Sequence, residues 1–136
     1  MTPASVTLVN QRTDAAVARH VEVAVTRGAR RRGLLGRAGL PSSSALILAP
    51  CAAIHTMFMT FAIDVVFVDG SGRALKVVEG LAPWRIAVEP SAGAVVELPA
   101  HRLRECPVSV GDCLYLRGED GQRFLVSAAD LREHLC

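Results

Sequence analysis

The feature that most restricts the fold of this chain is the apolar stretch at residues 51–69, CAAIHTMFMTFAIDVVFVD. A segment this apolar has to be buried, and its Val, Ile and Phe content is typical of strands. Before its closing Asp69 it nevertheless contains a cysteine, a histidine, two methionines and an aspartate. A buried polar group needs a hydrogen-bond partner or a function. The stretch therefore predicts central strand structure and, in the same place, a candidate site.

The rest of the chain also reads mostly as strands. Apolar or alternating runs lie between residues that favour turns, and residues 69–72 (DGSG) and 118–121 (GEDG) are typical of hairpins. Residues 11–16 are expected to form a turn. The expected strands are residues 5–10, 20–25, 45–49, 54–69, 73–79, 94–98, 113–117 and 122–126.

Two helices are expected. The first begins after an N-cap at Thr26 and ends at Gly36 or Gly39, and the second follows Ser127 near the end of the chain. No βαβ alternation is visible. The sequence therefore predicts one mainly β (α+β) domain over residues 1–136. It would be a small curled antiparallel sheet or barrel, with one helix after the second strand and a short C-terminal helix.

Composition and charge exclude some classes of protein. Hydrophobic residues make up 51% and charged residues 21%, which argues against disorder. A net charge of +2 is too small to imply a nucleic-acid partner. The positive charge is concentrated in a basic run, which is typical of a solvated helix face or, alternatively, of a patch for anions or a membrane surface. The run consists of Arg27, Arg30, Arg31, Arg32 and Arg37.

The expected location is the cytoplasm. The first fifteen residues lack a basic start and a long apolar core, and no uninterrupted apolar stretch has the length of a membrane helix. In a reducing compartment the four cysteines are expected to be thiols, and they lack the CxxC spacing of zinc and redox motifs. These cysteines are Cys51, Cys106, Cys113 and Cys136.

The first candidate site lies on the predicted central strand. In an extended chain His55, Met57, Met59 and Phe61 share one face. The imidazole and the two thioethers would then lie within joint reach of one ion, and such soft ligands suit Cu(I). The alternative is that His55 is a hydrogen-bonded core residue and that the methionines fill the core.

Asp64 is the least expected residue of the chain, because it stands among Val and Phe. If buried, its carboxylate needs backbone donors or a cation, which Lys76 or Arg85 could supply. It either caps a bend or loop, or faces a ligand or reaction. Trp84 and Arg85 follow a proline in a loop, a composition typical of recognition surfaces. The indole could stack on a ligand, or it could plug one end of a barrel.

Two further arrangements are open. A zinc site from Cys51, His55, Cys106 and Cys113 has suitable ligands but the wrong spacing. A nucleophilic pair of Cys51 with His55 or His101 has nothing around the thiol that marks it as activated.

Three functional classes follow. The favoured one is a non-catalytic binding module for a small polar or anionic ligand, with no cofactor and no nucleic-acid partner. The second is a hydrolase or transferase with His55 and Asp64 as acid and base, although no nucleophile elbow or phosphate loop is present. The third handles a soft metal through His55, Met57 and Met59. The residues expected to bind the ligand are His55, Thr56, Met57, Asp64, Lys76, Trp84 and Arg85.

Five motifs in order suggest a family: TRGARRRGLLGR, IHTMFMTFAIDVVFVDGSG, LKVVEGLAPWR, GAVVELPAH and VGDCLYL. Together they resemble the domain of unknown function 192, with a family-like core at about residues 20–117. The resemblance implies a compact, mostly β domain with a helix packed on it, and no established activity, substrate or cofactor. Ala62 departs from the pattern, because such sequences tend to have proline there. The motif positions are His55, Thr56, Met57, Asp64, Lys76, Pro83, Trp84 and Arg85.

Overall fold

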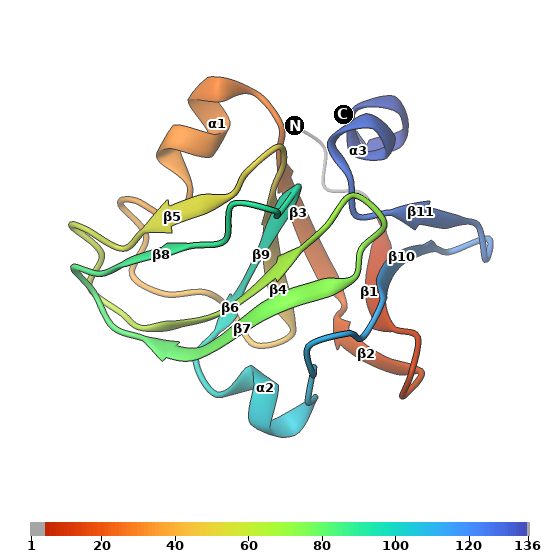
Figure 1. Cartoon of the computed structure of the whole chain (residues 1–136), viewed down its shortest axis with the longest axis horizontal. Helices are drawn as coiled ribbons and strands as arrows, with labels where there is room; N and C mark the ends of the chain where they lie inside the picture. The colour runs from red at the N-terminus through yellow and green to blue at the C-terminus, as the bar shows by residue number, and fades with distance from the viewer. Residues whose placement is uncertain (1–4, 136) are drawn as a thin grey trace.

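The computed structural model describes residues 5–135, which form a four-stranded sheet, a five-stranded sheet, a two-stranded ribbon and short helices (Figure 1). The predicted mainly β, α+β class is confirmed, and the sheets are open rather than closed into a barrel. The elements are β1 (Val6–Asn10), β2 (Ala15–Ala18), β3 (His20–Ala24), α1 (Arg27–Arg32), β4 (Ser44–Leu48), β5 (Ala53–His55), β6 (Ile63–Val68), β7 (Ala74–Leu81), β8 (Ile86–Val88), β9 (Ala94–Pro99), α2 (Arg102–Glu105), β10 (Leu114–Gly118), β11 (Arg123–Leu125) and α3 (Ala128–Leu135).

The four-stranded sheet has the antiparallel order β11-β10-β1-β2. It confirms the predicted strands at both ends of the chain and the hairpin between β10 and β11. The predicted turn at residues 11–16 is too long. Asp14 adopts a φ of 57°, and its N–H donates to the carbonyl of Asn10 at 2.8 Å. The chain therefore turns within four residues, and Ala15–Ala18 form an additional strand.

The five-stranded sheet has the order β3-β4-β9-β6-β7. Its β6–β7 hairpin confirms the turn predicted at residues 69–72. The prediction of no βαβ unit is wrong, because β3 and β4 are parallel neighbours connected through α1. Parallel neighbours require a crossover connection. Here the crossover contains a helix of only six residues, too short and too rich in arginine to show a helical hydrophobic period.

The predicted continuous strand at residues 54–69 is wrong. The chain forms β5, turns, and then forms β6. The buried hydroxyl of Thr56 explains the break, because it donates to the carbonyl of Ala82 at 2.6 Å and accepts from the N–H of Arg85 at 2.9 Å. Within the turn Phe58 adopts a φ of 66°. These bonds attach the turn to the segment before β8, so that β5 pairs with β8 in a ribbon that the sequence did not indicate.

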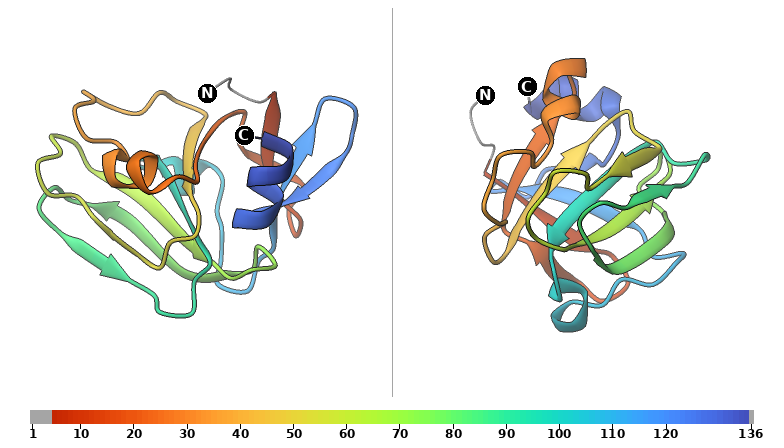
Figure 2. Two further views of the ribbon diagram at one scale, coloured as in Figure 1. Left: turned by 90° about the horizontal axis from the view of Figure 1, so that it is seen from above. Right: turned by 90° about the vertical axis from the view of Figure 1, so that its left-hand side faces the viewer.

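The sheets and the ribbon stack in layers and enclose two apolar clusters (Figure 2). The larger cluster lies between the two sheets and includes Leu8, Ile47, Val66 and Leu116. The smaller one lies on the other face of the five-stranded sheet, beneath the ribbon and the segment after α1. Strand β6 is buried on both faces, as its sequence predicted. Every second residue of the central strands therefore points toward the ribbon and α1.

The helices begin as predicted. Thr26 caps α1 by accepting from the N–H of Ala29 at 3.1 Å, and Ser127 accepts from the N–H of Asp130 at the start of α3. The predicted end of the first helix at Gly36 or Gly39 is wrong. Gly33 adopts a φ of 47° and its N–H closes the last turn on Ala29, so α1 ends at Arg32. The short helix α2 was not predicted.

A polar cluster around Asp112 joins β1 to the loop before β10. The carboxylate accepts from Arg12 Nε at 2.6 Å, Asn10 Nδ2 at 2.9 Å and the N–H of Ser109 at 2.8 Å. The Arg12 hydrogen bond holds the pKa of Asp112 well below its usual range. The stability from this pair is therefore present above the ordinary aspartate pKa of 3.8 and is lost as the pH falls below it.

We expect Asp112→Ala to lower the free energy of unfolding by about 2 kcal/mol at pH 7, because it removes charge-assisted hydrogen bonds. The loss is not larger because one partner, Arg12, is half-exposed and solvent weakens its interaction. Urea denaturation at pH 7 and at pH 3 measures the loss. Glu119→Ala in an exposed turn serves as the control. An equal loss at both pH values would contradict the ionic role of the carboxylate.

Candidate functional site

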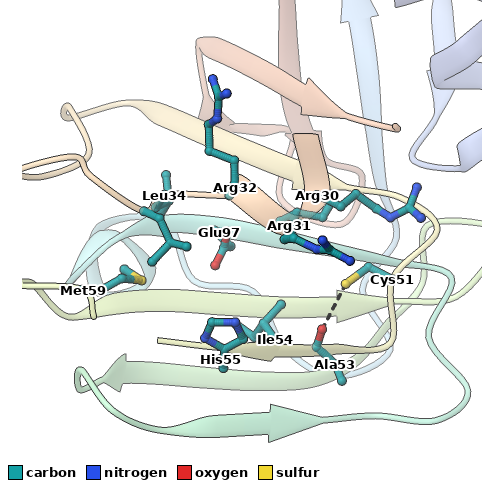
Figure 3. Close-up of a pocket in the computed structure, with 13 residues that line it drawn as sticks. Arg30, Arg31, Arg32, Leu34, Cys51, Ala53, Ile54, His55, Met59 and Glu97 are labelled. Atoms are coloured by element: carbon teal, nitrogen blue, oxygen red, sulfur yellow. Dashed lines mark hydrogen bonds between the residues drawn. The ribbon is translucent and has the colours of Figure 1, made fainter. Parts of the chain in front are cut away.

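A cavity of about 320 Å³ lies between α1, the residues after it, β4, β5 and β9 (Figure 3). It is therefore built where the crossover helix and the ribbon both cover the five-stranded sheet. The lining is about equally polar and apolar, and its charged groups are arginines and one glutamate. The lining residues are Arg30, Arg31, Arg32, Gly33, Leu34, Leu35, Leu48, Cys51, Ala53, Ile54, His55, Met59 and Glu97.

Glu97 is the most unusual group in this cavity. In β9 its neighbours Val96 and Leu98 face the larger apolar cluster, so alternation turns Glu97 toward the cavity. The residue is 4% exposed, and its carboxylate receives no hydrogen bond from any residue in the described range 5–135, but its oxygens are accessible from the cavity. Burial raises the pKa of Glu97 to about 7, against a smaller opposing effect of Arg37. The carboxyl group is thus an acceptor that the protein leaves open to the cavity.

Arginines from α1 form the opposite wall. Arg30 donates from Nη1 to the carbonyl of Val25 at 2.7 Å, and Arg32 points away from the other lining side chains. Arg31 is exposed and extends toward Cys51 in Figure 3. Within residues 5–135, none of the four α1 arginines forms an ion pair. Three of them, Arg30, Arg31 and Arg32, lie in the last turn, where positive charge stabilises the helix, and their charge is also available to an anion.

The next arginine along the chain is already paired. Arg37 donates from Nη2 to Glu22 at 2.6 Å. Glu22 in β3 and Glu97 in β9 both pair with Leu46 of β4, the strand between them. The pairing therefore satisfies one of the two carboxylates on this face and leaves the other, Glu97, without a hydrogen bond.

Cys51 lies in the cavity wall as a thiol. Its Sγ donates to the carbonyl of Ala53 at 3.1 Å, and burial raises the pKa of the thiol. The thiol is therefore less ionised at neutral pH than an ordinary cysteine, the opposite of what an activated nucleophile requires. Cys106 and Cys113 are also unpaired, whereas Cys136 lies outside the described residues.

His55 lines the cavity from β5, and its Nδ1 accepts from the N–H of Met57 at 3.3 Å. Met59 is buried and also lines the cavity, but Met57 does not. The expectation that all three share one strand face is wrong, because the strand ends at His55 and the methionines lie in the following turn. The geometric argument for a soft-metal site therefore loses its basis.

Asp64 does not line the cavity. It is fully buried in β6, and its carboxylate accepts from the N–H of Gly80 at 2.8 Å and from the N–H of Leu103 at 2.9 Å. Neither cation proposed for it makes the contact: Lys76 donates to the carbonyl of Val88, and Arg85 to that of Trp84. These contacts fit the structural interpretation of Asp64, a carboxylate that holds loop and helix backbone in place.

Trp84 lies on the surface, 55% exposed, with its ring 4.7 Å from that of Phe58. Neither it nor Arg85 lines the cavity. The hydroxyl and backbone of Thr56 hold their loop beside the turn after β5. Of the residues expected to bind the ligand, only His55 lines the cavity. Glu97, Arg30 and Arg31 line it as well, and of these three the sequence did not lead us to expect Glu97.

Two negative findings apply to the described residues. Within residues 5–135, no three His, Cys, Asp or Glu side chains are grouped so that they could hold a metal ion, and this includes the zinc arrangement considered above. No helix in the same range has the length and apolar character needed to cross a membrane.

The family follows from a comparison with family models. The DUF192 model, described as "Uncharacterized ACR", matches residues 8–116, which is most of the chain. The chain belongs to DUF192. This confirms the resemblance inferred from the motifs. A search of curated proteins finds no match.

Solved structures share the fold of this DUF192 chain. A "putative transcription regulator" from Sinorhizobium meliloti 1021 superposes with a TM-score of 0.71 at 20% identity, covering 84% of this chain and 95% of that chain. A protein of unknown function from Novosphingobium aromaticivorans DSM 12444 gives a TM-score of 0.68 at 18% identity, covering 84% and 92%. At these identities the likeness establishes the fold alone.

Proposed function

We propose that this DUF192 chain is a non-catalytic binding module that takes a small organic anion into the cavity between α1 and β9. The observation that carries the proposal is a set of arginines without ion-pair partners in residues 5–135, which line a cavity that also has apolar walls. Guanidinium groups bind carboxylates and phosphates through charge-assisted hydrogen bonds. Arg31 is the principal contact, because Arg30 already donates to Val25.

The size of the cavity limits the ligand. A volume of about 320 Å³ is at the lower end of the range for small-molecule sites. At roughly 30 Å³ for each water-sized group, it holds roughly ten non-hydrogen atoms. The apolar walls from Leu34, Ile54 and Met59 favour an aliphatic body. The proposal therefore excludes nucleic acid and other large partners from this site.

The enzymatic alternative receives less support. It requires His55 and Asp64 to act together, yet Asp64 is fully buried, bonded to two backbone N–H groups and absent from the cavity that His55 lines. A carboxylate in that environment is not available to a ligand.

We expect hexanoate to bind and Arg31→Ala to weaken its binding by roughly tenfold, the loss of one charge-assisted hydrogen bond. The measurement is an NMR titration of the labelled protein at pH 7, followed through the backbone amides of the cavity. Arg27→Ala is the matched control, because it removes the same charge from the same helix but does not line the cavity. We expect it to change the affinity by less than roughly twofold.

Two results would contradict the proposal. If both variants weaken binding equally, the helix acts as a diffuse charge and the cavity is not the site. If hexanoate produces no saturable shift at cavity residues such as Ile54 or Met59, the chain does not bind organic anions there.

A further inference from the structure

We infer that the ligand carries, besides its anionic group, a hydrogen-bond donor that binds the carboxylate of Glu97 on the sheet side of the cavity. The donor is a hydroxyl or an ammonium group. The inference rests on the proposed function and defines the class of ligand more closely: a short aliphatic anion with a donor at its other end.

Glu97 lies in the sheet with its carboxylate accessible only from the cavity, and no described residue donates a hydrogen bond to it. Buried polar groups in folded proteins are almost always hydrogen-bonded, because burial without a partner is costly. The cross-strand neighbours of Glu97 are Leu46 and Val65, whose side chains offer no donor. Arg37, the cation that acts on it electrostatically, is engaged by Glu22. The donors that reach this carboxylate therefore come from the cavity, as water in the free protein and, in our inference, as a group of the ligand when it is bound.

The other buried acid of the sheet shows how this chain satisfies a structural carboxylate. Asp64, one strand away in β6, receives backbone N–H donors from two distant segments. Glu97 receives none from residues 5–135, although it is buried to a similar degree. The difference indicates that Glu97 is kept as an open acceptor and not as a backbone support.

The positions of the charged and apolar groups in the cavity determine the order of the groups along the ligand. The arginines of α1 lie on the opposite side of the cavity from the sheet strand that carries Glu97. Leu34, Ile54 and Met59 supply apolar surface to the same cavity. An anion bound by Arg31 and a donor bound by Glu97 are thus joined by an aliphatic segment, within roughly ten non-hydrogen atoms. A purely apolar tail would instead bury the carboxylate against carbon, which costs binding energy.

The test compares probes that differ only in the donor. Hexanoate, 6-hydroxyhexanoate and 6-aminohexanoate are titrated into the protein at pH 8, together with the corresponding four-carbon acids, which cover a second span. The proteins are the unmodified chain, Glu97→Met, Glu97→Gln and a control, Glu119→Gln, which changes the same charge in an exposed turn. Folding of each variant is checked by its amide spectrum before titration.

At one chain length, a donor-bearing probe is expected to bind roughly tenfold more tightly than its parent acid, the value of one hydrogen bond to a charged group. The hydroxyl and amino probes show which donor is preferred. Glu97→Met is expected to remove the preference and to bind hexanoate better than the unmodified chain does. Glu97→Gln is expected to remove the preference for ammonium but to keep part of that for hydroxyl, since an amide oxygen still accepts. Glu119→Gln is expected to keep the full preference.

Three results would overturn the inference. If hexanoate binds as tightly as both donor-bearing probes, Glu97 does not select a donor, although the binding proposal stands. If the preference persists in Glu97→Met, the donor binds elsewhere. If no probe of either length binds, the inference fails together with the proposed function.

Discussion

Asp64→Ala is expected to lower the free energy of unfolding by about 3 kcal/mol, because the buried N–H of Leu103 and the partly buried N–H of Gly80 lose their acceptor. The carboxylate accepts from the N–H of Gly80 in β7 and from the N–H of Leu103 in α2. It therefore joins β6 to the end of β7 and to α2. No other hydrogen bond of the Leu103 N–H is present to replace it in the described structure. A loss of this size is a substantial part of the total stability of a small domain.

Urea denaturation at pH 7 measures the effect, with Asp69→Ala as the control. Asp69, in the turn after β6, also accepts backbone N–H groups, but at an exposed position where water can replace it. We expect the control to cost about 1 kcal/mol. If Asp64→Ala costs no more than Asp69→Ala, the interpretation of Asp64 as a buried support of the backbone is wrong.

Glu97→Met is expected to have the opposite effect, raising the free energy of unfolding at pH 8 by about 3 kcal/mol. Burial raises the pKa of Glu97 from 4.5 to about 7, so the folded state prefers the protonated acid. The stability of the unmodified chain is therefore complete below pH 4.5, falls as the pH rises through 7, and is lowest above it. Methionine has a similar length and no charge, so the variant lacks this fall.

Urea denaturation of both proteins between pH 5 and 8 tests this prediction, because the difference between them isolates Glu97. The groups around the carboxylate are Arg37, which opposes the shift, and Cys51, His55 and Arg31 of the same cavity. The affected pH window lies above that of Asp112, whose contribution is lost only below its ordinary pKa of 3.8. A constant difference in stability from pH 5 to 8 would show that Glu97 is ionised throughout and that burial does not control it.

The hairpins, the doubly buried strand β6 and the beginnings of two helices were predictable because their signals are local. The turn sequence at residues 69–72 closes on itself, with Asp69 accepting from Ser71 and Arg73. The sequence also predicted Gly72 as a turn glycine. It did not predict that the neighbouring sheet packs so close that a Cβ at Gly72 would overlap the carbonyl oxygen of Leu114. That requirement comes from the approach of two distant segments.

The break in the predicted central strand was not predictable from its own residues. The stretch is uniformly apolar, and Thr56 reads there as an ordinary strand residue. Its buried hydroxyl breaks the strand by bonding to Ala82 and Arg85, which lie more than twenty residues further along the chain. The shared face of His55, Met57 and Met59 was lost with that strand, and with it the geometry of the soft-metal hypothesis.

The sequence by itself determined that this chain buries two acids in apolar strands, at positions 64 and 97, and that arginines gather in one short helix. An acidic residue among apolar neighbours is as unexpected at Glu97, within AVVEL, as it is at Asp64. Only the tertiary structure decided which acid supports the backbone and which faces a cavity. The reason is that a buried carboxylate is satisfied by distant donors: Leu103 lies 39 residues from Asp64, and within residues 5–135 no segment brings such a donor to Glu97.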